Sequence, residues 1–394
     1  MPSSKRIYMD HTAGRPVDQR VIDAMLPYMT TLYGNPASLH SFGQEPRQAL
    51  EQTRAKVADL INAERKESVI FTSGATESNN LAVKGVAFRN QSRGNHIITS
   101  SIEHMSVMNP VKYLKTKGFD VTFLPVDKYG IVDLDSLEKS MNDKTILVSI
   151  MYANGEIGTI QPIKEISQIV HRKNAVLHVD ATAACGHVPI DVKTEGIDLL
   201  TLSSNDMYGP KGIGALYIKQ GVVIEPLIHG GGQERGLRSG TENLPDAVGF
   251  GKAAELAKAE MAVESERLTK LRVRLIKGLL DAVPTSFLNG HPTRRLPDNV
   301  AVRFSYIEGE SILLSLDLQG VAASSGSACT AKTLEPSHVL LAIGLKHEEA
   351  HGSLLCTLGR QNTDEEVDYV ISIMPNIIQR LRVMSPLTPK ELKG

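Results

Sequence analysis

Short apolar runs rich in β-branched residues alternate with amphipathic segments between residues 69 and 219. Because fully buried parallel strands are apolar on both faces, this alternation predicts a mostly parallel sheet covered by helices on both faces. The fold class that we expect is therefore α/β, with one strand in each of seven runs: VIFTSG, NHIITSSI, DVTFLPV, TILVSIMYA, AVLHVDA, LLTLSSN and GALYIK.

A long helical pattern without a breaker covers residues 250–283 and is rich in Ala, Leu, Glu, Lys and Arg. It is expected to leave the large unit and enter a smaller α+β unit, which continues with strand NVAVRFSYI, helix ESILLSLDLQ, strand GSLLCTLG and a final helix after TDEEVD. We therefore expect a large domain of residues 15–262 and a small domain of residues 1–14 and 263–394.

The balanced charge of the chain argues against highly charged partners. Lys and Arg total 43 against 44 Asp and Glu, and like charges form no long run, so neither nucleic acid nor a membrane surface is an expected partner. The N-terminus lacks an apolar signal core, and no stretch of about 18 apolar residues occurs. The sequence predicts a soluble, cytoplasmic protein with a small-molecule or protein partner.

Three cysteines are too few for a disulfide framework or a four-cysteine zinc site. Cys185 and Cys356 lie in apolar segments and are predicted to be small core residues. Cys329 lies in VAASSGSACTAKTLEPSHV, whose small residues lack the periodicity of a core segment. This context favours a reactive thiol on a loop over the alternative of a buried small hydrophobic residue.

Polar motifs follow three of the predicted strands. FTSGATESNN joins a strand to a helix through a Gly/Ser/Thr turn, which suits a phosphate group; the alternative is a plain helix start capped by Thr76 and Glu77. Asp180 in LHVDA falls at the carboxyl edge of the sheet, where ligands bind in open α/β folds, although such an aspartate is more often a cap. His104 in SIEHMSV also follows a strand, and its alternative is a surface or core histidine.

Taken together, the motifs resemble one family in order and spacing: TSGATESNN, EHMSV, NGEIGTIQP, HVDAT, YGPKGIGALY, GGGQERGLRSGTEN, SSGSACT and LGRQNTDEEVD. These are the NifS/IscS-like cysteine desulfurases, and the resemblance runs nearly end to end. It implies the class V aminotransferase fold, which is fold type I of the pyridoxal-phosphate enzymes. It also implies a homodimer that uses pyridoxal 5′-phosphate to remove sulfur from L-cysteine, holds the sulfur as a persulfide on a loop cysteine, and passes it to an iron–sulfur scaffold protein.

The resemblance assigns roles to individual residues of this chain. His104 would stack on the pyridine ring, and Asp180 would pair with the ring nitrogen and keep it protonated, so that the ring acts as an electron sink. Cys329 would carry the persulfide on a long loop of the IscS kind. The remaining predicted cofactor ligands are Ala75, Thr76 and Ser203 for the phosphate, Thr241 for the phosphate of the neighbouring subunit, and Asn154 and Asn205.

Five positions depart from the family pattern, and all are expected around the cofactor or substrate. Asp206 stands where the family has its Schiff-base lysine, so no covalent bond to the cofactor can form there, and the carboxylate can take over at most proton transfer. The other four departures are Asn205 for histidine, Ala183 for glutamine, Gly155 for the second asparagine of NNEIG, and Leu355 for the arginine that clamps the substrate carboxylate. An archaeal subgroup of IscS-like proteins is similar in these respects, including the aspartate.

The loss of the arginine clamp leaves the substrate carboxylate without its charge-assisted hydrogen bonds. Arg15, in DHTAGRPVD where the family usually has a small polar residue, is a candidate replacement; the alternative is a solvated surface arginine. L-cysteine should bind weakly unless Arg15 or another group compensates.

Three functional interpretations follow. The first is an iron–sulfur assembly partner that docks an IscU-type scaffold, with Cys329 as persulfide carrier or as one ligand of a shared [2Fe–2S] cluster, and with weak or absent desulfurase activity. The second is an active desulfurase with noncovalent pyridoxal phosphate, in which Asp206 moves protons. The third is an enzyme that uses pyridoxamine phosphate, whose ammonium group pairs with Asp206.

Overall fold

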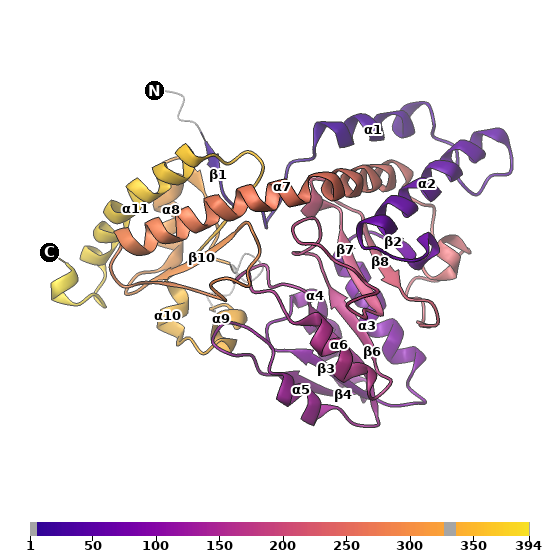
Figure 1. Cartoon of the computed structure of the whole chain (residues 1–394), viewed down its shortest axis with the longest axis horizontal. Coiled ribbons are helices and arrows are strands. Elements are labelled where there is room, and N and C mark those ends of the chain that lie inside the picture. Colours follow the sequence, from indigo (N-terminus) through magenta and orange to yellow (C-terminus); the bar gives the residue numbers. More distant parts are fainter. Residues whose placement is uncertain (1–5, 327–335, 394) are drawn as a thin grey trace.

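The computed structural model describes residues 6–326 and 336–393. Helix α7 (Leu244–Ala282) runs from the larger unit into the smaller one (Figure 1). It begins before the predicted start at residue 250 because the side chain of Asn243 caps it, accepting from the N–H of Asp246, and because Pro245 fits the first turn. No helix within the described ranges is long and apolar enough to span a membrane.

The larger unit is built on the predicted seven-stranded sheet, with the strand order β2-β8-β7-β6-β5-β3-β4. Only β8 runs antiparallel to its neighbours, so the sheet is mostly parallel as predicted. Each strand falls in one of the seven apolar runs: β2 (Val69–Thr72), β3 (His96–Ser100), β4 (Asp120–Leu124), β5 (Thr145–Met151), β6 (Val176–Asp180), β7 (Leu199–Ser203) and β8 (Gly214–Ile218).

Helices cover both faces of this sheet, because successive strand residues point to opposite sides. Ile97 and Leu147 pack with α3 (Ala75–Arg89) and α4 (Met105–Thr116) on one face. Their neighbours Ile98 and Val148 pack on the other. That face is covered by α1 (Gln19–Thr30), α2 (Ser41–Leu60), α5 (Leu134–Ser140), α6 (Ile163–His171) and the first part of α7.

The smaller unit has a hydrophobic cluster of its own, which includes Ile7 and Met9 from the N-terminal segment. Its sheets are β12-β10-β9, antiparallel, and the parallel pair β1 and β11. The domain boundary near residue 262 stays a prediction. The elements are β1 (Ile7–Tyr8), β9 (Ser286–Leu288), β10 (Asn299–Phe304), α8 (Gly309–Asp317), β11 (Val321–Ala322), α9 (His338–Ala342), α10 (His347–His351), β12 (Ser353–Thr357) and α11 (Asp364–Met384).

Candidate active site

Several predicted site residues meet at the carboxyl edge of the large sheet. Asp180 ends β6 and Ser203 ends β7, and these two strands are neighbours. Gly214, the first residue of β8, pairs with Ser203 on one side and with Thr72, the last residue of β2, on the other. The parallel topology therefore gathers residues from distant parts of the sequence at the place where α/β folds bind ligands.

The turn between β2 and α3 has the form that an anion requires. Gly74 precedes the helix with φ 144°, and no side chain caps the helix start. A Cβ placed on Gly74 would meet no atom within 4 Å, whereas one on Gly214 would lie 2.7 Å from the Gly74 carbonyl carbon, so the turn is pressed onto β8 but open on its other side. The alternative of a helix capped by Thr76 or Glu77 is not observed, because the Glu77 carboxylate instead accepts from the Ser73 N–H at 2.7 Å. An uncapped helix start fits the phosphate of the predicted cofactor.

Asp180 is linked to His104 by a chain of hydrogen bonds. One carboxylate oxygen accepts from Thr182 N–H and O–H at 3.0 and 2.6 Å. The other accepts from Asn79 Nδ2 at 2.7 Å, and the same nitrogen donates to Ser106 Oγ at 2.8 Å. Ser106 Oγ lies 2.7 Å from His104 Nδ1, so one network orients both residues that the resemblance places against the pyridine ring.

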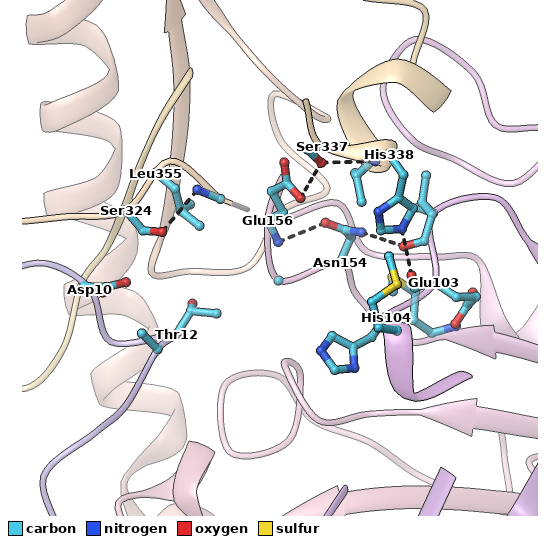
Figure 2. A pocket seen from close by; sticks show the side chains of 17 residues that line it. Asp10, Thr12, Glu103, His104, Asn154, Glu156, Ser324, Ser337, His338 and Leu355 are labelled. Atoms are coloured by element: carbon cyan, nitrogen blue, oxygen red, sulfur yellow. Dashed lines mark hydrogen bonds between the residues drawn. The ribbon is translucent and has the colours of Figure 1, made fainter. Parts of the chain in front are cut away.

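A cavity of about 400 Å³ lies next to His104, between the two units (Figure 2). Asn154 lines it, but its side chain is mostly engaged: Oδ1 accepts from the N–H groups of Glu156 and Ile157, and Nδ2 donates to the Ile102 carbonyl. The main role of the Asn154 side chain is therefore to hold the backbone of the cavity wall in place. The labelled lining residues are Asp10, Thr12, Glu103, His104, Asn154, Glu156, Ser324, Ser337, His338 and Leu355.

Two of the five predicted departures from the family pattern, Gly155 and Leu355, line this cavity. Leu355 on β12 places an apolar side chain in its wall, and its backbone pairs with that of Ser324. Gly155 also lines it, and a Cβ there would lie 3.6 Å from the Cβ of Ala183. Among the lining residues in the described part of the chain there is no lysine or arginine, so these residues offer a substrate carboxylate no cationic partner.

Two acids in the cavity wall, the buried Glu103 and the partly buried Glu156, were missed by sequence reasoning. Glu103 accepts from Ser100 O–H at 2.6 Å and from Met151 N–H at 3.0 Å; Glu156 accepts from Ser337 O–H at 2.7 Å. Burial raises the pKa of each carboxyl group to about 8. Both residues lie inside the quoted motifs EHMSV and NGEIG, but glutamate is usually exposed, so only their place in those motifs was a signal.

Asp206 lies on the 3₁₀ turn η2 (Asn205–Met207), which directly follows β7. Burial raises the pKa of its carboxyl group to about 6. The charge of Arg15 and a hydrogen bond from Ser203 both lower this pKa but do not cancel the effect of burial. The neighbouring Asn205 has a buried side-chain oxygen with no partner among the described residues. Ser203, Asn205 and Asp206 therefore lie together at the end of β7.

Arg15 is buried, so the alternative of a solvated surface arginine is wrong. Its Nη2 donates to Asp298 Oδ2 at 2.7 Å and its Nη1 to the Tyr208 hydroxyl at 3.3 Å. It does not line the 400 Å³ cavity, whereas Leu355 does. The predicted role of Arg15 as a substrate clamp is therefore opposed by a carboxylate partner that it already has.

Thr241 lines a second cavity of about 220 Å³ with Thr72, Ser73 and Gly212, beside the phosphate turn. The loop before it is fixed by Glu234, which receives two hydrogen bonds from Arg54 at 2.7 and 2.8 Å and one from the Phe71 N–H at 2.9 Å. The predicted contact of Thr241 with the phosphate of a second subunit stays a prediction.

Cys185 and Cys356 are buried, as predicted, and burial raises the pKa of each thiol to about 12. Cys329, predicted as persulfide carrier and metal ligand, lies outside the described residues. Within the described ranges no group of three or more His, Cys, Asp or Glu side chains could hold a metal ion.

Comparison with known proteins identifies the family. The model of the family "Aminotransferase class-V" matches residues 7–370. Cysteine desulfurase IscS 1 of Archaeoglobus fulgidus is 60% identical over 380 residues, which are 96% of this chain and 99% of that protein. Cysteine desulfurase IscS of Methanosarcina thermophila is 56% identical over 390 residues, which are 99% of this chain and 96% of that protein. A solved NifS-like protein, 39% identical, superposes with a TM-score of 0.90 over 96% of this chain and 100% of its own.

These findings confirm the predicted resemblance and fold class. Class V aminotransferases and cysteine desulfurases depend on pyridoxal phosphate, so the predicted cofactor is confirmed at the level of the family. The chain belongs to the class V aminotransferase family and is similar over nearly its whole length to cysteine desulfurases of the IscS kind.

Proposed function

We propose that this chain is an IscS-like protein of iron–sulfur cluster assembly that binds pyridoxal phosphate without a covalent bond and acts weakly or not at all on L-cysteine. The observation that carries the proposal is Asp206, a carboxylate at the position where the family has its lysine, on the turn that follows β7. A carboxylate forms no covalent bond with an aldehyde, so only noncovalent contacts can retain the cofactor at this position.

The cofactor-holding residues fit the group. The uncapped helix start at Ala75 and Thr76, with Ser203 beside it, would bind the phosphate. Asp180 would hold the ring nitrogen, and His104 would lie against the ring face; the hydrogen-bond chain between them fixes both orientations. Bound there, pyridoxal phosphate supplies an electron sink for chemistry at the substrate's α-carbon.

The substrate side is poorly suited to an amino acid. The described lining of the 400 Å³ cavity contains Asp10, Glu103 and Glu156 but no cationic lysine or arginine. Arg15 is already paired with Asp298. An L-cysteine carboxylate would therefore enter next to acidic groups without a cationic partner from these residues, which supports weak binding.

The iron–sulfur role is supported by the relatives named IscS and by the retention of Cys329 in the sequence. In this proposal the chain forms a homodimer and docks an IscU-type scaffold. Cys329 then acts as a persulfide carrier supplied by another sulfur donor, or as one thiolate ligand of a [2Fe–2S] cluster shared with the scaffold.

Two measurements test the proposal. Sulfide release from L-cysteine should be near background with pyridoxal phosphate present, and equal for wild type and Cys329→Ser. With a scaffold protein, iron and inorganic sulfide, the wild type should prolong cluster lifetime and Cys329→Ser should not. Identical cluster lifetimes would remove the ligand role.

An active desulfurase is the second candidate, and the pKa of Asp206 favours it. A carboxyl group with a pKa of about 6 can exchange protons near neutral pH and could replace the lysine in that one task. Rapid sulfide release that depends on both Cys329 and Asp206 would establish this candidate and overturn the first.

A further inference from the structure

Neither Arg15 nor Asp206 carries the charge that the family usually has at its position. The family usually has a small polar residue at the first position and a cationic lysine at the second, whereas this chain has a cation at the first and an anion at the second. Both residues lie near Asp298, an acid that is itself 3% exposed and bonded to Arg15. The cation therefore remains in this part of the site but on a different element.

The surroundings of Arg15 stabilise its positive charge. The side chain is buried and pairs with Asp298 at 2.7 Å. Its guanidinium carbon lies 5.3 Å from the centre of the Tyr208 ring, within the range of a cation–π contact. Its Nε is buried and has no partner within the described part of the chain. A buried guanidinium is costly unless acceptors pair with it, and Asp298 is the carboxylate that pairs with Arg15.

Tyr208 connects Arg15 to the turn that carries Asp206. It directly follows η2 and has a left-handed backbone with φ 60°, a conformation that costs a bulky residue energy and so requires support from its surroundings. The segment around Arg15 supplies that support twice: Arg15 donates to the Tyr208 hydroxyl, and the Asp18 N–H donates to the Tyr208 carbonyl at 2.9 Å. The Arg360 N–H also donates to the hydroxyl, at 2.9 Å.

We propose that Arg15 and Asp206 form one electrostatic unit, in which Arg15 carries the cation that the lysine supplies elsewhere in the family and acts as a positioning residue that keeps Asp206 anionic and oriented. Arg15 is in this view no clamp for the substrate. An anionic Asp206 at this position suits a cofactor that carries an amine, so the unit would select pyridoxamine phosphate over forms of the cofactor without an amine. This last step rests on the proposed function, whereas the coupling of the two charges does not.

The groups that face Asp206 from neighbouring elements support this assignment. Arg15 lowers the pKa of Asp206, whereas the acids Asp180 at the end of β6 and Asp298 before β10 raise it. His187, which is neutral at neutral pH because burial lowers its pKa to about 4, and Cys185 are further titratable neighbours. Glu260, Glu264 and Arg360 line the same small cavity as Asp206. Arg15 is thus the cation that offsets two acids, and without it Asp206 would be protonated at a higher pH.

A double-mutant cycle in cofactor-free protein tests the coupling. Asp206→Lys places a second cation beside Arg15 and should lower the melting temperature by several degrees, and Arg15→Thr should do the same by leaving Asp298 and Asp206 unpaired. The double variant, which restores the charges usual in the family, should melt above Asp206→Lys alone. Strictly additive shifts would overturn the proposal. If Asp206→Lys does not fold, the neutral cycle of Arg15→Met and Asp206→Asn gives the same test, and Arg15→Met should then be less harmful in the Asp206→Asn background.

Binding of pyridoxamine 5′-phosphate against pH tests the selection. Pyridoxine 5′-phosphate is the matched control, since it carries the same titrating phosphate with a hydroxyl in place of the amine. The ratio of the two affinities should favour the amine above about pH 6 and fall below it, because Asp206 is then protonated. Arg15→Met should move this inflection to higher pH, Arg15→Lys should restore it, and Asp206→Asn should abolish it. An inflection that Arg15→Met leaves in place would contradict the proposal. If Arg15→Met instead changed only L-cysteine affinity, Arg15 would be a substrate clamp.

Discussion

The two halves of the candidate site differ in how fully their carboxyl groups are hydrogen-bonded. In the cofactor-holding half, Asp180 accepts three hydrogen bonds and the phosphate turn is held between β2 and β8. In the reacting half, Glu103, Glu156 and Asn205 each keep a buried oxygen without a partner among the described residues, and Leu355 places an apolar side chain in the cavity wall. Two of the predicted departures from the family pattern, Gly155 and Leu355, line the cavity of this second half.

This difference separates the binding of a cofactor from its use. Phosphate and ring contacts depend on backbone geometry and on a few buried donors, which this chain retains. Substrate binding and proton transfer depend on particular side chains, which it has exchanged. A protein of this kind can keep the fold and the cofactor while its chemistry changes.

The largest expected effect concerns the bracing of the cofactor-holding half. Glu234→Ala leaves Arg54 buried without its bidentate carboxylate and should destabilise the fold by about 3–5 kcal/mol in denaturant unfolding. Glu266→Ala is the control, since it removes an exposed ion pair with Lys270 and should change stability by less than about 0.5 kcal/mol. Equal losses for the two variants would show that the buried pair braces nothing.

The next effect compares one acid from each half. Asp180→Ala removes the proposed partner of the ring nitrogen and should weaken pyridoxal phosphate binding by about 10- to 100-fold. Asp206→Ala should change it much less, because the phosphate and ring contacts remain. Spectroscopic titration of both variants measures the two affinities. The division of the site into halves fails if Asp206→Ala is the more damaging change.

Restoring a cation to the reacting half should have a smaller effect. Leu355→Arg places a guanidinium in the wall of the 400 Å³ cavity and should increase L-cysteine affinity about 10-fold, because it supplies a charge-assisted partner for the carboxylate. Leu355→Met is the control, with similar volume and no charge. Calorimetric titration that finds the same affinity for both variants would mean that another group already holds the carboxylate.

The smallest effect is on the pH dependence of stability. Glu156 has a pKa of about 8 in the folded chain against an ordinary value of 4.5, so the neutral acid stabilises the fold at low pH and this contribution is lost as pH rises through 8. Glu156→Gln stays neutral and should show a shallower decline, with a melting temperature a few degrees above wild type at pH 9 relative to pH 6. Parallel melting curves for the two proteins would contradict the raised pKa.

Sequence pattern predicted the sheet well because six of its seven strands are buried almost throughout; the exception is the edge strand β4, in which Asp120 and Phe123 are exposed. It placed Asp180 at the carboxyl edge of the sheet, where open α/β folds bind ligands, whereas Ser203 was assigned from the family resemblance. It could not predict the burial of Arg15, whose partner Asp298 lies 283 residues away in the chain. The sequence also could not predict that Glu103 and Glu156 line the cavity, because glutamate is usually exposed.

The central claim is that the cofactor is retained without a covalent bond because Asp206 replaces the lysine. The most direct test is to load the full chain with pyridoxal phosphate, treat it with borohydride, and measure the mass of the intact chain and of its peptides. The chain should keep its unmodified mass, and the reduced cofactor should be recovered free after denaturation. A pyridoxyl group fixed to any lysine of the chain would contradict the claim and show that another lysine has taken over the covalent role.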